Sequence, residues 1–331
     1  MKFGALIGGI VGLGLSAWLL ASFGVGRILT VLGHAGWFAI PALIAFHVVQ
    51  MMCSALGWRE IAGTAAPRPT IRTFLLLRWI RESVNNLLPL AQIGGEFAAA
   101  RYLHRRGMRL APAIAGTVAD LSIEMISQIG FTFLGLILLL QTDGNSGIAG
   151  YVRSGLLAAA VLIACLFGAM RFGFASVVER GLLKLGRRIG WAGAAGVEGL
   201  HDALAACYRA PARVALATLY HLVSWLLGGI EVCLALHFLG ADVGIRCGMV
   251  IESLGQALKT VGFAVPGALG VQEGGYIVVC GIFGLSPEVA IALSLLKRLR
   301  EVALGLPGLT LGRYVETKAA AGSASISEAV P

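Results

Sequence analysis

Long apolar segments recur along this chain and restrict what it can fold into. About 20 apolar residues are enough for an α-helix to cross a bilayer, and backbone polar groups in the hydrocarbon must be satisfied within the helix itself. The sequence therefore predicts an all-α, polytopic membrane helix bundle. Its six long helices are expected at residues 4–25, 36–58, 113–140, 151–170, 213–240 and 288–312.

Composition supports the membrane class. The chain of 331 residues is 57% hydrophobic and 13% charged, whereas soluble domains are about 25% charged. The net charge of +9 comes from basic residues in short loops, which orient a membrane protein and do not indicate a nucleic-acid partner. The six cysteines form no CxxC pair and are expected to be small core residues, so no metal or cofactor is predicted.

Loop charges predict the orientation. Arginine and lysine concentrate in residues 59–72, 101–109 and 171–213, whereas the segment 141–150 has Asp143 as its charged residue. Basic loops stay on the cytoplasmic side of the membrane. Both termini are therefore expected in the cytoplasm.

A single transmembrane domain is predicted over residues 1–318. Within it, the segment 171–210 mixes basic with apolar residues, which is typical of an amphipathic helix on the anionic inner leaflet. The tail at residues 319–331 is rich in Ala and Ser and is expected to be disordered.

Two apolar regions, residues 73–103 and 247–285, are interrupted by proline and glycine and do not suit straight helices. Each is predicted to be a broken helical hairpin, either re-entrant or fully spanning. Non-helical backbone at membrane depth needs protein or a watery cavity beside it, so the breaks are expected to face inward. The predicted hinge residues are Pro89, Gly94, Gly95, Pro266 and Gly270.

The second broken region repeats the first. A shift of 177 positions aligns residues 89–124 with 266–301 without a gap, and eight of the 36 positions are identical. Three predicted crossings separate the two hairpins, so the chain enters them from opposite sides. Residues 36–140 and 213–313 are therefore predicted to be inverted repeats, an architecture that secondary transporters use with the substrate near the midplane.

One long helix carries an acidic face and its repeat a basic one. Asp120 and Glu124 stand at i and i+4, and the aligned segment carries Lys297, Arg298 and Glu301. Charges at membrane depth must face the interior and pair. The bases can pair with Glu301 in their own helix or with the acids of the other repeat. These five residues are predicted to form a network that couples the repeats, as a structural element or as part of transport.

Arg78, Arg81 and Asn85 fall on one helical face of the first hairpin, and Asn86 follows them. A guanidinium group beside a cavity suits a phosphate or carboxylate headgroup, although an arginine can also snorkel to the surface. All four residues are predicted to bind substrate.

Glu96 and Glu273 each follow a glycine-containing break. Either carboxylate can cap the helix that it opens, or the two can line a central cavity and take up protons or bind a cationic group. Both are included among the predicted substrate-binding residues.

These motifs resemble a known family. The segments RESVNNLLPLAQIGGE and VPGALGVQEGGYIVVCGIFGLSPEVAIALSLLKRLRE are similar to the membrane region of lysylphosphatidylglycerol synthase/flippase proteins, and within that group to HpnL-like proteins associated with hopanoid biosynthesis. The resemblance covers residues 4–313. It implies a bacterial inner-membrane lipid translocase or transport protein, with phospholipids or hopanoids and lipid-biosynthesis proteins as partners. The few residues after the last predicted helix do not suit the aminoacyl transferase domain of full-length synthases.

Two other functions stay open. A membrane-embedded lipid-modifying enzyme could use the paired acids Asp120 and Glu124, but the sequence shows no nucleophile–base or metal set. A non-catalytic subunit could recruit a hopanoid or lipid-synthesis complex through the basic segment 171–210.

Overall fold

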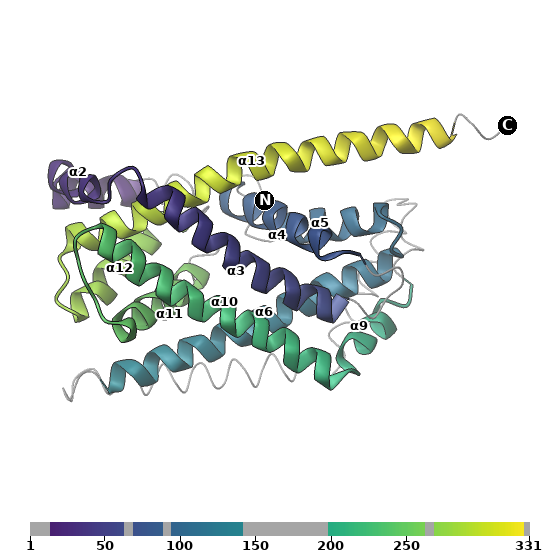
Figure 1. The fold of residues 1–331 in the computed structure, drawn as a ribbon, viewed down its shortest axis with the longest axis horizontal. Coiled ribbons are helices and arrows are strands. Elements are labelled where there is room, and N and C mark those ends of the chain that lie inside the picture. The colour runs from purple at the N-terminus through teal and green to yellow at the C-terminus, as the bar shows by residue number, and fades with distance from the viewer. Residues whose placement is uncertain (1–13, 63–68, 89–93, 142–197, 262–267, 328–331) are drawn as a thin grey trace.

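The described part of the chain is a bundle of α-helices joined by turns (Figure 1). The predicted helix at 151–170, most of the segment 171–210, and the prolines Pro89 and Pro266 lie outside the described residues. The computed structural model describes residues 14–62, 69–88, 94–141, 198–261 and 268–327.

Two sets of four helices follow the predicted repeats, and the broken hairpins are confirmed as pairs of short helices. The first set is α3 (Ala39–Ala62), α4 (Ile71–Leu87), α5 (Gly94–Arg105) and α6 (Leu110–Leu140). The second set is α10 (Pro211–Phe238), α11 (Ile245–Val261), α12 (Val271–Ile282) and α13 (Pro287–Ser327).

The repeat is visible in the backbone. The shift of 177 positions places α5 on α12 from end to end, and the first residue of α6 on the first residue of α13. Both turns between these helices use a glycine with positive φ, Gly107 at 95° and Gly284 at 72°, a conformation that glycine adopts readily. The two turns therefore end their helices in the same way.

The repeats run in opposite directions and exchange partners. Figure 1 shows α3 beside α10 with opposite chain directions, and the hairpins α4–α5 and α11–α12 at opposite ends of the bundle. The first hairpin helix of each repeat packs against the last helix of the other repeat, so α4 contacts α13 and α11 contacts α6. The predicted inverted repeat is thus an interlocked pair.

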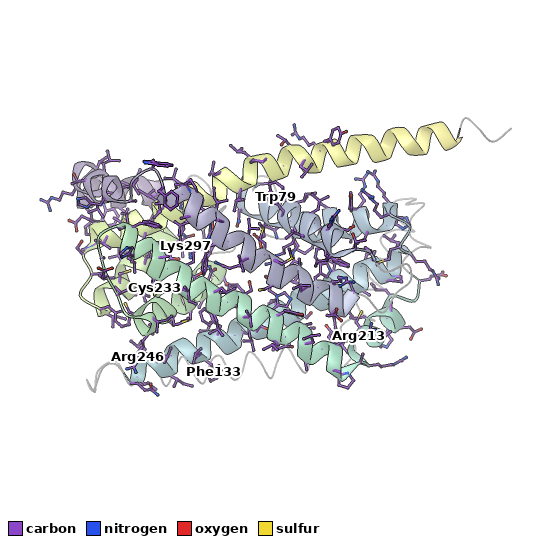
Figure 2. All side chains as sticks on the ribbon, in the orientation of Figure 1. Trp79, Phe133, Arg213, Cys233, Arg246 and Lys297 are labelled. Carbon is purple, nitrogen blue, oxygen red and sulfur yellow. The ribbon has the colours of Figure 1, made fainter. Side chains whose placement is uncertain are left out.

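Glycines bring α4 and α13 close together. A Cβ atom at Gly308 would lie 3.0 Å from Trp79 Nε1, and one at Gly305 would lie 2.9 Å from Leu87 Cγ. Trp79 faces α13 (Figure 2) and donates from Nε1 to the Leu304 carbonyl at 2.8 Å. Small residues at such a contact let helix backbones approach in a membrane.

Two apolar cores flank a polar middle. Helix α3 contributes Leu43 to one core and Trp58 to the other, and His47, Gln50 and Ser54 stand between them in its sequence. Three helices of the described residues, α3, α6 and α10, are long and apolar enough to cross a membrane. The polar residues therefore lie part-way along membrane-crossing helices.

The N-terminal region agrees with the predicted helix at 4–25 in its described part and adds a further helix after it. Its described part is a helix at Gly14–Phe23, which turns through 84° into α2 (Val25–His34). Gly24 between them has a φ of 82°, which ends the first helix. The residues after the break are apolar and continue as helix, so residues 26–34 are not a loop.

Two further segments refine the predicted domain plan. Helix α13 continues to Ser327, so residues 319–327 are helical where disorder was expected. Alanine has the highest helix propensity, and the alanines at 319–321 extend a helix that is already formed. Helix α9 (Leu200–Tyr208), the described end of the predicted amphipathic segment, packs against α6 with Leu200 and Cys207 buried.

Candidate functional site

A polar cavity of about 240 Å³ lies between the two repeats. Helices α3 to α6 line it from the first repeat, and α10, α11 and α13 line it from the second. Its charged lining residues are the bases Arg78, Arg81, Lys259 and Arg300 and the acids Glu82, Glu96, Glu124, Glu252 and Glu301.

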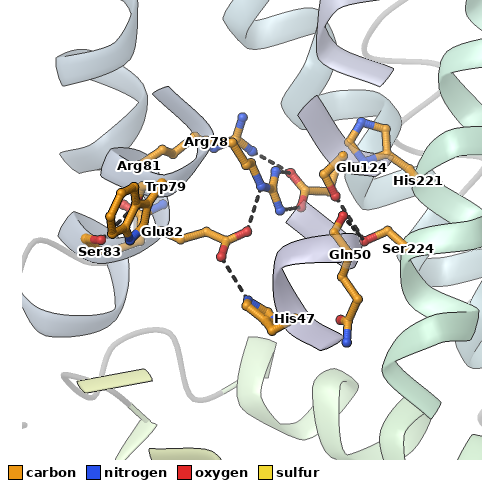
Figure 3. A network of polar contacts seen from close by, with 12 residues as sticks. His47, Gln50, Arg78, Trp79, Arg81, Glu82, Ser83, Glu124, His221 and Ser224 are labelled. Carbon is orange, nitrogen blue, oxygen red and sulfur yellow. Dashed lines mark hydrogen bonds and ion pairs between the residues drawn. The ribbon is translucent and has the colours of Figure 1, made fainter. Parts of the chain in front are cut away.

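Arg78 bridges two acids across the first repeat (Figure 3). Its Nε donates to Glu82 Oε1 at 2.7 Å, one turn further along α4. Its two terminal nitrogens bind both oxygens of Glu124 on α6. Such a two-point contact is the strong geometry for an arginine and a carboxylate, and it fixes α4 against α6.

Arg81 holds three carboxylates. Its Nη1 lies 2.6 Å from Asp120 Oδ2, its Nη2 binds Glu124, and its Nε lies 3.1 Å from Glu96 Oε1. The Arg81 side chain is 3% exposed and that of Asp120 is fully buried. Both predicted phosphate-binding arginines therefore line the cavity, but their nitrogens are already engaged by acids of the protein.

Asn85 and Glu96 join the two arms of the first hairpin. The Asn85 amide donates to Glu96 Oε1 at 3.1 Å, and its carbonyl oxygen accepts from the Gly95 backbone N–H at 2.9 Å. Gly95 approaches the backbone of α4 closely, because a Cβ there would lie 2.8 Å from Arg81 Cα. The predicted hinge pair Gly94–Gly95 thus forms the tightly packed first turn of α5. Asn86, which follows Asn85 in α4, lines the cavity.

The second repeat balances its charges with a different pattern. Lys259 Nζ lies 2.9 Å from Glu301 Oε1, and Lys297 binds Glu252 on α11. The repeat shift places Lys259 on Glu82, so a direct Lys–Glu pair replaces the Glu82–Arg78–Glu124 bridge. Lys297 and Arg298, for which pairs with Glu301 within α13 were one of the expectations, bind Glu252 of α11 and Glu273 of α12.

Glu273 lies outside the lining of the cavity, unlike its repeat equivalent Glu96. Its Oε2 accepts from the Gly270 N–H at 2.7 Å, and its Oε1 lies 2.6 Å from Arg298 Nε. Ser294 also donates to Oε1 at 3.2 Å. Glu273 therefore caps α12 and anchors it to α13, which is the capping role that the sequence left open.

Several contacts cross directly between the repeats, among them those of Trp79 with Leu304 and of Gln50 with Glu231. His221 on α10 lies 2.9 Å from Asp120. His47 Nδ1 on α3 lies 3.4 Å from Glu231, and Ser54 donates to Ser224 at 3.0 Å. The repeat shift converts the pair His47–Glu231 into Ser224–Ser54, so these two contacts are equivalent positions across the pseudo-two-fold axis. Of the predicted coupling residues, Asp120 makes such a crossing contact.

Sequence reasoning missed several members of this site. Glu231, Glu252, Lys259 and Arg300 are polar residues in apolar helices, and Arg300 binds Glu231. Their signal was present, because an ionisable residue within an apolar segment is expensive and marks a functional or paired position. His47 and His221 carry a weaker signal, because each is a lone histidine in an apolar helix.

The charge balance limits what the cavity can bind. Five acids against four bases line it, so it does not attract an anion by net charge. Paired acids and bases around a hollow suit a polar headgroup that offers hydroxyl, amine or mixed charges. Among the described residues, no group of three or more His, Cys, Asp or Glu side chains is arranged to hold a metal ion.

Comparison with protein families identifies the class of membrane protein to which the chain belongs. No curated protein matched the chain. A match to a family model does extend over residues 5–308, which includes every lining residue of the polar cavity and ends within α13. The family is described as the lysylphosphatidylglycerol synthase TM region, whose membrane setting is lipid-related. The chain belongs to this family of membrane proteins.

Proposed function

We propose that the protein moves lipids across a bacterial inner membrane, with the lipid headgroup passing through the polar cavity. The observation that carries the proposal is the cavity of about 240 Å³ lined by charged residues of both inverted repeats. Inverted repeats that enclose a polar site at broken helices support alternating access. The family adds a lipid-related setting, and the headgroup belongs to a phospholipid or a hopanoid.

The ion pairs around the cavity support this role. A headgroup can replace one partner of a pair only if the remaining charge keeps another partner, since an uncompensated buried charge is costly. Arg78 has two acidic partners and Arg81 has three. Either arginine can exchange one carboxylate for a headgroup and still be neutralised by another acid. These shared ion pairs are therefore exchangeable contacts.

Glu96 is the residue that tests the proposal. It lines the cavity and accepts from Asn85 and Arg81. Glu96→Gln keeps the size and an acceptor for Asn85 but removes the charge. We expect purified wild-type protein in liposomes to move labelled phospholipid or hopanoid probes between leaflets. The variant is expected to move them at least about tenfold more slowly, which corresponds to about 1.4 kcal/mol of lost interaction free energy.

Glu288→Gln is the matched control. Glu288 lies outside the cavity lining and pairs with Arg27, whose side chain is 80% exposed, at 3.6 Å. The control is expected to keep the wild-type rate. Equal rates in all three proteins would refute the role of the cavity. No probe movement by wild type would refute the translocase proposal. A lipid changed chemically during the assay would favour the alternative that the protein is a lipid-modifying enzyme.

A further inference from the structure

His47 on α3 lies between carboxylates of both repeats. Its Nε2 lies 3.1 Å from Glu82 Oε2 on α4 (Figure 3), and its Nδ1 lies 3.4 Å from Glu231 Oε2 on α10. The His47 side chain is 17% exposed and lines the polar cavity. A proton can therefore reach the imidazole ring from the cavity, at a point where the two repeats meet.

The contacts of His47 favour a protonated ring. Arg78 and Arg300 hold Glu82 and Glu231 as carboxylates, so both acids can only accept from the ring. A neutral imidazole has one N–H donor and one lone pair. With Nε2 donating to Glu82, the lone pair of Nδ1 would face the Glu231 carboxylate. At 3.4 Å this contact is long for a hydrogen bond, and it is attractive only when Nδ1 carries a proton.

The charges around His47 lack one positive group. Four acids and three bases share a cavity or a contact with His47 on the described helices packed against α3, namely Glu82, Glu124, Glu231 and Glu301 and Arg78, Arg81 and Arg300. Arg300 opposes a positive ring, but it binds Glu231 and lies 3.9 Å from Glu301. One proton on His47 makes the acids and bases of this group equal in number.

The inverted repeats make this contact one-sided. The repeat shift places His47 on Ser224 and Glu231 on Ser54, and the two serine hydroxyls form a hydrogen bond of 3.0 Å. Histidine changes its charge in the physiological pH range, whereas a pair of serines stays neutral. A transporter of this architecture alternates by moving one repeat against the other. Such a movement therefore acts on one contact that depends on a proton and on an equivalent contact that does not.

We propose that His47 Nδ1 is a proton-binding site that couples lipid movement to a proton gradient, an inference that rests on the proposed function. The proton holds α3 against α10 at Glu231, and it leaves when this contact opens to pass the headgroup. A ligand that binds one of two states shifts the balance between them. Each cycle of the cavity therefore binds and releases a proton, and a pH difference across the membrane drives net lipid movement.

The test uses the full chain in liposomes with acyl-labelled phosphatidylglycerol or, separately, a labelled hopanoid, and with the membrane potential clamped to zero. A gradient of about one pH unit is a tenfold ratio in proton activity, so wild type is expected to shift the leaflet ratio of the probe by up to about tenfold. Inside-acid and outside-acid liposomes are expected to shift it in opposite directions.

His47→Gln is expected to lose the response to the gradient, because the amide still donates to Glu82 but does not titrate. Glu231→Gln supplies a second variant, which keeps His47 and removes the carboxylate that faces Nδ1, and it is expected to lose the response as well. His237→Gln is the matched control. His237 lies 2.6 Å from Asp242 in an exposed pair outside the polar cavity, and its replacement is expected to keep the response.

Nuclear magnetic resonance of isotope-labelled histidine gives a readout that does not need transport. The chain has six histidines, and His47→Gln identifies the signal of His47. That signal is expected to change from a protonated to a neutral ring between about pH 5 and 8, with the same midpoint as the rate of probe movement.

A wild-type leaflet ratio that ignores the gradient overturns the coupling, as does a full response in both His47→Gln and Glu231→Gln. A His47 ring that stays neutral throughout the titration overturns the proton site. Absence of movement of either probe, together with a protonated His47 ring, would refute the proposed function and support the proton site, so the two failures give different results.

Discussion

Arg81 shows why the charged residues of this site are not interchangeable. Its three nitrogens each reach a different carboxylate, from Glu96 on α5 and from Asp120 and Glu124 on α6. The planar guanidinium holds these directions at once, and its face also lies over Trp58, 5.4 Å from the ring centroid. A lysine ammonium carries its three N–H donors on one nitrogen, so it does not span the three separate positions that the guanidinium nitrogens occupy. The identity of the base, and not only its charge, is therefore required.

Arg81→Lys is expected to destabilise the protein. At least one buried carboxylate loses its base, and breaking a buried pair costs about 3–5 kcal/mol. The unfolding transition of purified protein in detergent, followed by tryptophan fluorescence, measures the change. Arg109→Lys is the control, because Arg109 is exposed before α6. Equal stability of the two variants would show that Arg81 does not hold the three acids together.

The pair Lys259–Glu301 gives a second prediction for single residues. A cycle of Lys259→Gln, Glu301→Gln and the double variant is expected to show a coupling of about 0.5–3 kcal/mol, as for residues in direct contact. The exposed pair Arg27–Glu288 is expected to give at most about 1 kcal/mol in the same cycle. Unfolding of each variant in detergent supplies the values, and additive effects at Lys259 and Glu301 would contradict the observed pairing.

Among the elements, the contact between α4 and α13 depends on glycines instead of large apolar residues. Gly305 and Gly308 let α13 approach α4 near Pro307. The contact joins the first repeat to the second, so its fit decides how closely the interlocked halves meet. A single methyl group at this position tests the fit.

Gly308→Ala is expected to destabilise the protein by about 1–3 kcal/mol, the usual cost of overpacking. The new Cβ would lie 3.0 Å from the Ser83 Cβ and from Trp79 Nε1. Gly274→Ala on α12, where nothing lies within 4 Å, is expected to be stabilising by up to about 1 kcal/mol through helix propensity. Thermal unfolding measures the change in stability of both variants. A change of the same sign in both would contradict the close glycine contact between α4 and α13.

The elements were largely predictable from sequence because apolar length and breaks are local signals. The hairpins followed from proline and glycine within apolar segments, and the repeat followed from identities such as Glu96 with Glu273. The sharp turn at Gly24 was not predicted, because a glycine among apolar residues does not indicate whether or how far the chain bends there. Helix formation at 319–327 was missed because the composition of a tail says little about the helix before it.

The pairing of charges was less predictable. Spacing within one helix favoured Lys297 with Glu301, yet Lys297 binds Glu252 of α11. A pair at i and i+4 contributes only about 0.3–0.5 kcal/mol, whereas a buried acid without a base costs several kcal/mol. The helix crossings therefore decide the partners, and these crossings are not encoded in local spacing. Arg78, Arg81, Asn85 and Glu96, which flank the same break, do line one cavity, whereas Glu273, predicted to share it, does not.

At the scale of the whole molecule, inversion makes a testable statement about sidedness. The repeat shift aligns Arg109, which precedes α6, with Ser286, which precedes α13, and both residues are exposed. The two hairpins lie at opposite ends of the bundle (Figure 1). Equivalent positions of inverted repeats must therefore face opposite sides of the membrane.

Single cysteines at these positions, Arg109→Cys and Ser286→Cys, test the inversion in a background without the native cysteines. A membrane-impermeant maleimide added to intact spheroplasts is expected to label position 286, and to label position 109 only after permeabilisation, because basic loops favour the cytoplasmic side, where the segment 101–109 is predicted. Labelling of both positions from the same side would contradict an inverted repeat. Labelling of position 109 alone would reverse the orientation.

The interlocking of the repeats also sets an order for biosynthesis. Arg81 pairs with Asp120 only 39 positions later in the chain, so this ion pair can form soon after the first repeat is synthesised. Trp79 on the other side of α4 must wait for Leu304, 225 positions later. A nascent chain halted between the repeats therefore has Arg81 already paired, while its α4 still lacks the cover of α13. Maturation is completed only when the last helix leaves the ribosome and closes over the first hairpin.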